Sequence, residues 1–155
     1  MAKIFLSIFL SLAATSALAA EDCYLHEINP ETKKIFASQE EYNSAAMEWK
    51  YREPQSPGFI ALARAYAVYS KEKAVAEKMT RDKRAHCYVG CRISQELDYR
   101  TAEYVAWYKE EKDIKDCNKG THFEHADFDA TVEGAQMGQS QVDAAGCLQS
   151  CTQKY

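Results

Sequence analysis

The sequence has little glycine and proline, no long apolar run beyond its N-terminus and no excess of basic residues. Its 155 residues include 6 glycines and 3 prolines, and no stretch alternates apolar with polar residues as a half-buried strand does. After the N-terminus, no segment offers the roughly 20 apolar residues of a membrane span. The formal net charge of −4 argues against nucleic acid or anionic lipid as a partner. These absences favour an all-α domain with no stable membrane span.

An export signal stands at the N-terminus. Lys3 precedes an apolar stretch from Ile4 to Ala14, and Ala17-Leu18-Ala19 supplies small residues for cleavage. A positive residue, an apolar core of about a dozen residues and a small-residue site are typical of a secretory signal peptide. We therefore expect residues 1–19 to be removed, with an uncleaved anchor as the alternative, and residues 20–155 to form one periplasmic or extracellular domain.

All six cysteines follow this signal: Cys23, Cys87, Cys91, Cys117, Cys147 and Cys151. An even number in an exported chain predicts three disulfide bonds, because that compartment is oxidising. The 87/91 and 147/151 pairs are each spaced so that both sulfurs lie on one helix face. This geometry favours two rungs between antiparallel helices, Cys87–Cys151 and Cys91–Cys147, which leaves Cys23 to pair with Cys117. A zinc site built from the paired cysteines is the less favoured alternative.

Capping residues and apolar periodicity predict a small disulfide-stapled domain of about five to six helices. A capping box at residues 38–41 opens the first helix, and prolines 54 and 57 close it. The second helix begins near Phe59 and reaches about Met79, with a break near Ser70 as an option. Its apolar stripe comprises Phe59, Leu62, Tyr66 and Tyr69. Later helices are expected over 82–97 (capped by Thr80 or Asp82), 99–115, from a cap at Asp127 or Asp129 to about Gly138, and after a cap at Ser140 with Asp143.

His86 is the first candidate for chemistry, on the apolar face of the helix expected over 82–97. A lone histidine in that position more often only fills the core. On the next helix, however, Glu110 and Asp113 follow a seam of small residues, so either carboxylate could reach His86. A carboxylate partner fixes the tautomer of an imidazole and raises its basicity, as a general base requires. We expect Glu110 to be that partner, with Asp113 as the second choice.

A second polar group contains His122 and His125 with Asp127 and Asp129 nearby. Two histidines and two aspartates could bind a metal ion. The favoured alternative is a polar loop whose aspartates cap a helix. We therefore expect neither a metal ion nor another cofactor.

Three groups of residues, taken in order, resemble a known family. They are Asp82-Lys83-x-x-His86-Cys87-x-x-x-Cys91, Ala102-x-x-x-Ala106-x-x-Lys109-Glu110-x-x-Asp113 and Asp127-x-Asp129-x-x-x-x-Gly134. Over residues 80–136 the chain resembles a poorly characterised helical domain of secreted bacterial proteins, also found at the C-terminal ends of Rhs-type polymorphic-toxin polypeptides. The resemblance implies an all-α fold in which His86, Glu110, Asp113 and Asp127 converge, and it supplies no reaction.

Two functional hypotheses follow. The favoured one is a non-enzymatic exported module that binds an unknown protein or glycan partner or accompanies an effector, because the 10 tyrosines suit such contacts. The alternative is a small secreted hydrolase that uses His86 with carboxylates of residues 110–129. A toxin-associated role is compatible with either hypothesis.

Overall fold

The computed structural model describes residues 23–25, 27–116 and 122–155, and this part of the chain is built from helices. A short 3-10 turn (Cys23–Leu25) precedes six α-helices. They are α1 (Gln39–Tyr51), α2 (Phe59–Ala76), α3 (Asp82–Glu96), α4 (Tyr99–Asp116), α5 (His125–Gly138) and α6 (Ala144–Lys154). In these described residues the only strand-like pairing is a single bridge between Ile28 and Ile35. The prediction of an all-α domain with about five to six helices is confirmed.

Side-chain caps explain where two of the helices begin. The Ser38 hydroxyl accepts from the backbone N–H of Glu41, at 3.2 Å, and opens α1. The Asp143 carboxylate accepts from the N–H of Gly146 at 2.8 Å and opens α6. Each bond satisfies a backbone donor that the first turn of a helix leaves unpaired.

The predicted caps of two other helices are wrong. Helix α3 begins after Arg81, so neither Thr80 nor Asp82 caps it. Helix α5 begins after Glu124, which leaves Asp127 inside the first turn. The Asp127 carboxylate binds Lys83 and faces His86, so it does not turn back to the helix end.

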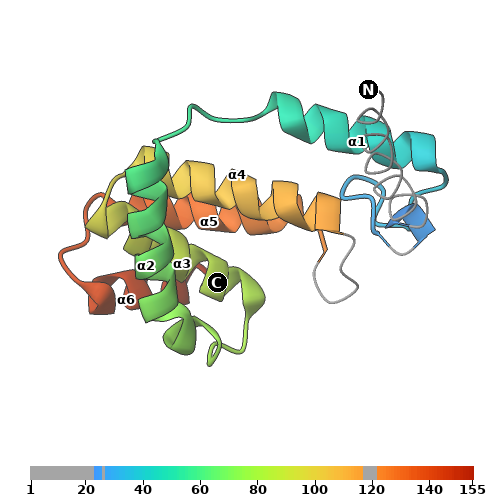
Figure 1. The fold of residues 1–155 in the computed structure, drawn as a ribbon. Helices are drawn as coiled ribbons and strands as arrows, with labels where there is room; N and C mark the ends of the chain where they lie inside the picture. Colours follow the sequence, from blue (N-terminus) through green and yellow to red (C-terminus); the bar gives the residue numbers. More distant parts are fainter. Residues whose placement is uncertain (1–22, 26, 117–121) are drawn as a thin grey trace, which may run out of the picture.

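The centre of the molecule is the contact between α3 and α5, with α4 beside both (Figure 1). Two glycines let the backbones of α3 and α5 touch. A Cβ added at Gly90 would overlap the carbonyl of Thr131, and one added at Gly134 would overlap the carbonyl of Cys87. No other residue type therefore fits at these two positions without a shift of the backbone.

Two disulfide bonds tie α6 to α3. Cys87 pairs with Cys151 and Cys91 pairs with Cys147, each with 5.7 Å between the Cα atoms. These are the two predicted rungs, and all four sulfurs are buried. Cys117 lies outside the described residues, so the predicted Cys23–Cys117 bond stays a prediction.

Helix α2 runs unbroken to Ala76, and its buried face differs from the predicted one. Its packed residues are Ala65, Val68, Glu72 and Ala76, whereas Phe59 is 85% exposed and Tyr66 is 71% exposed. The reason is a polar contact with α3, where Tyr88 and Arg92 donate to the Glu72 carboxylate at 2.6 and 3.1 Å. Small and aliphatic residues on that side let α2 approach α3 closely.

Helix α1 lies over the end of α4, away from α6 (Figure 1). A separate aromatic core joins α1 to α4. The indole N–H of Trp49 donates to the Trp107 carbonyl at 3.3 Å, and that of Trp107 donates to the Trp49 carbonyl at 3.2 Å. Phe36, Tyr42, Ile114 and Phe123 complete this core. Within the described ranges, no helix is long and apolar enough to cross a membrane.

Candidate functional site

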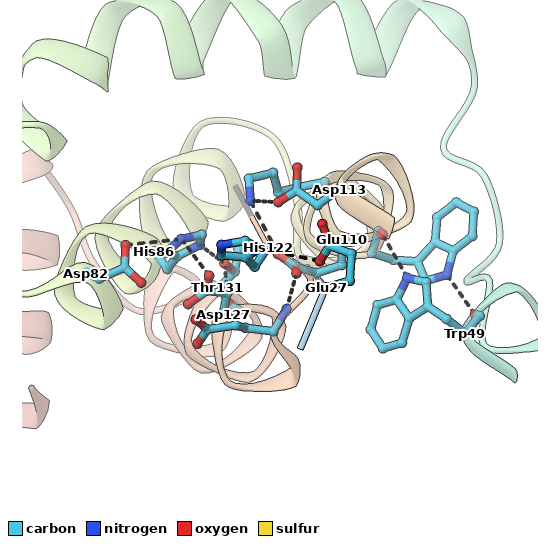
Figure 2. Close-up of polar contacts among 12 residues, drawn as sticks. Glu27, Trp49, Asp82, His86, Glu110, Asp113, His122, Asp127 and Thr131 are labelled. Atoms are coloured by element: carbon cyan, nitrogen blue, oxygen red, sulfur yellow. Dashed lines mark hydrogen bonds and ion pairs between the residues drawn. The ribbon is translucent and has the colours of Figure 1, made fainter. Parts of the chain in front are cut away.

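His86 lies on α3 and faces α5. Its Nε2 is 3.3 Å from Oδ2 of Asp127 and 3.7 Å from Oδ1 of Asp82, and its Nδ1 is 3.3 Å from Oγ1 of Thr131 (Figure 2). The expected partner was Glu110 or Asp113 on α4, and that expectation is wrong. The correction follows from Gly90, one turn after His86, because the close contact at this glycine brings α5 against this face of α3.

Thr131 selects the tautomer of the imidazole. Its hydroxyl donates to the Asp127 carbonyl at 2.8 Å, so Oγ1 is left as an acceptor for Nδ1–H of His86. In the neutral ring Nε2 therefore carries a lone pair. Burial lowers the pKa of His86, although Asp127 and Asp82 oppose this effect. The ring is consequently neutral at pH 7, with its lone pair directed between two carboxylates.

Lys83 holds the carboxylates around His86. Its ammonium contacts Asp127, Glu124 at 2.7 Å and Asp82 at 3.1 Å. Burial opposes the charge of this lysine, but these hydrogen bonds outweigh burial and raise its pKa. Burial also raises the pKa of Asp127, against the opposing effects of His86 and Lys83. The charge states of Lys83, His86 and Asp127 thus depend on one another.

Glu110 and Asp113 border this cluster without touching His86. Both side chains are about 1% exposed. Oε2 of Glu110 accepts from the backbone N–H of Glu124 at 2.9 Å and so holds the start of α5. Lys109 contacts Asp113 and lies 3.7 Å from Glu110. Burial raises the pKa of Glu110 to about 7. Because Glu110 contacts the start of α5 and Asp113 contacts Lys109, both carboxylates act on the site through its surroundings.

The two histidines considered as metal ligands point to different places. Nδ1 of His122 is 3.4 Å from Glu27, and the ring of His125 stacks on Trp49 with 5.3 Å between centroids. Neither joins Asp127. Among the described residues, one set of three potential ligands does converge, namely Asp82, His86 and Asp127, whose ligand atoms lie within 4.8 Å of one another.

Sequence reasoning did not find Asp82, Lys83 and Thr131 as members of the site. The signal was present in the spacing. Asp82 is four residues before His86, and Asp127 is four residues before Thr131, so each pair shares one face of its helix. What the spacing alone cannot show is that α3 and α5 turn these two faces toward each other.

The site is partly open to solvent. The side chain of His86 is 19% exposed and that of Asp82 is 66% exposed. Two surface hollows lie elsewhere, one over Tyr108 and Glu111 and one of about 240 Å³ beside Trp49 and His125. Neither hollow contains His86, Asp82 or Asp127. The candidate site is therefore defined by the convergence of these polar side chains and not by a cavity.

Comparison with protein-family models, curated proteins and solved structures found no match to the chain.

Proposed function

We propose that the chain is an exported, effector-type hydrolase whose reaction takes place at His86. The observation that carries the proposal is the neutral imidazole with a fixed tautomer, whose Nε2 lone pair lies beside Asp127 and Asp82. A histidine of this kind accepts a proton from water and returns it to a leaving group. The resemblance of residues 80–136 to toxin-associated domains supports the effector role, and the two disulfides suit an exported protein.

Each neighbour of His86 has a part in such a reaction. Water is deprotonated as its oxygen attacks the substrate, the proton moves to Nε2, and it then passes to the departing group. Asp127 and Asp82 stabilise the imidazolium that forms, because both carboxylates lie within 4 Å of Nε2. Thr131 keeps the ring in one orientation. Lys83 positions the two carboxylates and takes no direct part in the proton transfer.

The charge around His86 favours a neutral substrate. Asp82 and Glu124 are exposed acidic residues beside His86 and Lys83, and they repel a phosphodiester or another anion. Amide, ester and glycosidic bonds carry no charge and meet no such barrier. We therefore propose a peptide, an ester or a glycan as the substrate class.

Burial of carboxylates supports a functional role for this region. Glu27, Glu110, Asp113 and Asp127 are each less than a tenth exposed. Removing a charged group from water costs several kcal/mol unless it is fully paired, and a small domain has only about 5–15 kcal/mol of net stability. Proteins tolerate such clusters chiefly at functional sites.

Substitution of His86 tests the proposal. We expect His86→Gln and Asp127→Asn to fold, while activity toward a panel of peptide, ester and glycan substrates falls on the order of 100-fold. His122→Gln is the matched control, because His122 lies outside the cluster and its loss leaves His86 unchanged. A second readout is the growth rate of a bacterial host that exports the chain to its periplasm. A folded His86→Gln protein with full activity would contradict the proposal.

A binding role is the second candidate, and the solvent face of α2 favours it. Phe59, Ile60 and Tyr66 are more than two thirds exposed, and Arg64 is the only charged residue between positions 59 and 70. A helix that is apolar on two faces is normally covered on both. The lone Arg64 favours a protein partner with an apolar surface and an acidic rim.

A photo-crosslinker at position 66 tests this second candidate. It should form one discrete protein adduct that the same group at position 149 of α6 does not form. Arg64→Glu should remove that adduct, because the partner's rim would then meet a like charge. An adduct that persists in Arg64→Glu would exclude the acidic partner.

A further inference from the structure

The geometry points to a divalent metal site, of the zinc class, formed by Asp82, His86 and Asp127. This inference rests on the proposed function and revises one role in it: the same side chains would bind an ion, and the ion, in place of the imidazole, would activate water. It also departs from the expectation that the chain binds no metal. Its basis is the arrangement of three acceptor atoms.

The three acceptor atoms face one another. They are Oδ1 of Asp82, Nε2 of His86 and Oδ2 of Asp127, and all lie within 4.8 Å of one another (Figure 2). Nδ1 of His86 faces Oγ1 of Thr131, so Nε2 is the ring nitrogen that is turned toward the two carboxylates. An imidazole nitrogen and carboxylate oxygens are the kinds of atoms that bind zinc in proteins.

The separations fit the size of a zinc site. Two ligand atoms that are each about 2.0–2.1 Å from a tetrahedral zinc ion lie about 3.3 Å apart. Nε2 of His86 and Oδ2 of Asp127 are 3.3 Å apart. Oδ1 of Asp82 is 3.7 Å from the same nitrogen, and this side chain is 66% exposed, so a bound ion could draw it closer. A mixed set of one imidazole and two carboxylates suits zinc or manganese, and the tetrahedral spacing favours zinc.

Each proposed ligand is held by a second group, as in known metal sites. Thr131 accepts from Nδ1–H and so fixes the metal-facing nitrogen of His86. Lys83 contacts Oδ1 of Asp127 and Oδ2 of Asp82, which are the oxygens on the far side of each carboxylate. The lysine therefore orients the two carboxylates and leaves their inner oxygens available.

Carboxylates outnumber the basic groups in contact with them at this site. Lys83 contacts three of them, those of Asp82, Glu124 and Asp127. A site of this composition is better suited to a cation than to an anion. With three protein ligands the fourth position of zinc stays open, and zinc in such sites lowers the pKa of a bound water to about 7. His86 would then be a ligand, and the ion would take over the activation of water.

Titration with Zn²⁺ tests the inference. The full chain, with its disulfides intact and after removal of metal by a chelator, should bind one Zn²⁺ per chain in a calorimeter. Asp82→Asn should weaken binding at least about tenfold, with little change in folding because Asp82 is exposed. Glu124→Gln is the matched control, because it removes the same charge beside Lys83 without removing a ligand. Co²⁺ in place of Zn²⁺ should show the visible absorption of a tetrahedral complex.

Three outcomes would overturn the metal site. They are the absence of saturable Zn²⁺ binding, equal weakening in Asp82→Asn and Glu124→Gln, and loss of binding in a His122→Gln/His125→Gln double variant. These results are separable from those on the proposed function. Hydrolysis that depends on His86 in zinc-free protein would retain the hydrolase and exclude the ion. Zinc bound at Asp82 without hydrolysis of any substrate would retain the ion and exclude the hydrolase.

Discussion

The buried carboxyl of Glu110 should make the protein less stable as the pH rises, and Glu110→Gln should remove that effect. Burial raises the pKa of Glu110 to about 7, from an ordinary value of 4.5. Between these values the folded chain holds a proton that the unfolded chain releases. Stability is therefore greatest below pH 4.5 and falls as the pH passes through 7. The difference corresponds to about 3 kcal/mol in the free energy of unfolding.

Glutamine is the right substitution because it keeps the shape and one acceptor oxygen. The amide oxygen can still accept from the N–H of Glu124, which Glu110 binds at 2.9 Å, while the charge is gone at every pH. The variant should therefore equal the wild type near pH 4.5 and exceed it by about 3 kcal/mol at pH 8.

Urea unfolding of both proteins at pH 4.5 and pH 8 measures this difference. Glu103→Gln makes the same chemical change on the same helix outside the buried cluster and is the control. His86 acts in the opposite direction, because its lowered pKa means that stability is gained as the pH rises toward its ordinary value of 6.5 and is constant above that value. The comparison of wild type with Glu110→Gln removes this contribution, which both proteins share. Equal pH dependence in the two proteins would show that folding does not raise the pKa of Glu110.

Two further predictions concern the packing of α3. Gly134→Ala should lower the free energy of unfolding by roughly 3 kcal/mol or more, because the added Cβ would overlap the Cys87 carbonyl. Gly146→Ala is the control: its Cβ meets only a flexible side chain, so it should cost far less. Thermal melts of both variants measure the difference. Replacing Cys91 and Cys147 by serine should lower the free energy of unfolding by about 3 kcal/mol. A bond that closed this loop in a chain without other cross-links would contribute about 4 kcal/mol, but the Cys87–Cys151 bond already closes a longer loop around it. A loss under about 1 kcal/mol in urea unfolding would contradict this.

The disulfides were predictable because cysteine spacing carries its own geometry. Residues four apart on a helix share a face, and two such pairs match in only one register when their helices are antiparallel. Both observed bonds, Cys87–Cys151 and Cys91–Cys147, have that register. The prediction needed no knowledge of any other element.

The buried face of α2 was not predictable in this way, because the helix is apolar on two sides. Periodicity favours the side with Phe59 and Tyr66, whose rings are larger, yet these rings are exposed. The side that packs has Ala65 and the carboxylate of Glu72, which Tyr88 of α3 binds. A buried polar contact between helices leaves no periodic signal, so an apolar pattern alone selects the wrong face.

The partner of His86 could have been found from glycine. Gly90 on α3 and Gly134 on α5 both occupy helix interiors, where glycine is unfavourable unless a close contact requires it. Two such glycines indicate that these helices touch, and they do. The seam of small residues before Glu110 was a real signal as well, since Ala102 and Ala106 are buried, but it did not bring that carboxylate to the histidine.

The position of the candidate site follows from the same contacts that hold α3 in place. His86 immediately precedes Cys87, whose sulfur is bonded to α6 and whose carbonyl lies against Gly134 of α5. The backbone of His86 is thus fixed from two sides by its neighbour in the chain. Asp127 and Thr131 stand on the same stretch of α5, one or two turns before Gly134. The separation between the imidazole and its carboxylate is therefore set by a disulfide and a glycine contact, and the aromatic core around Trp49 plays no direct part in it.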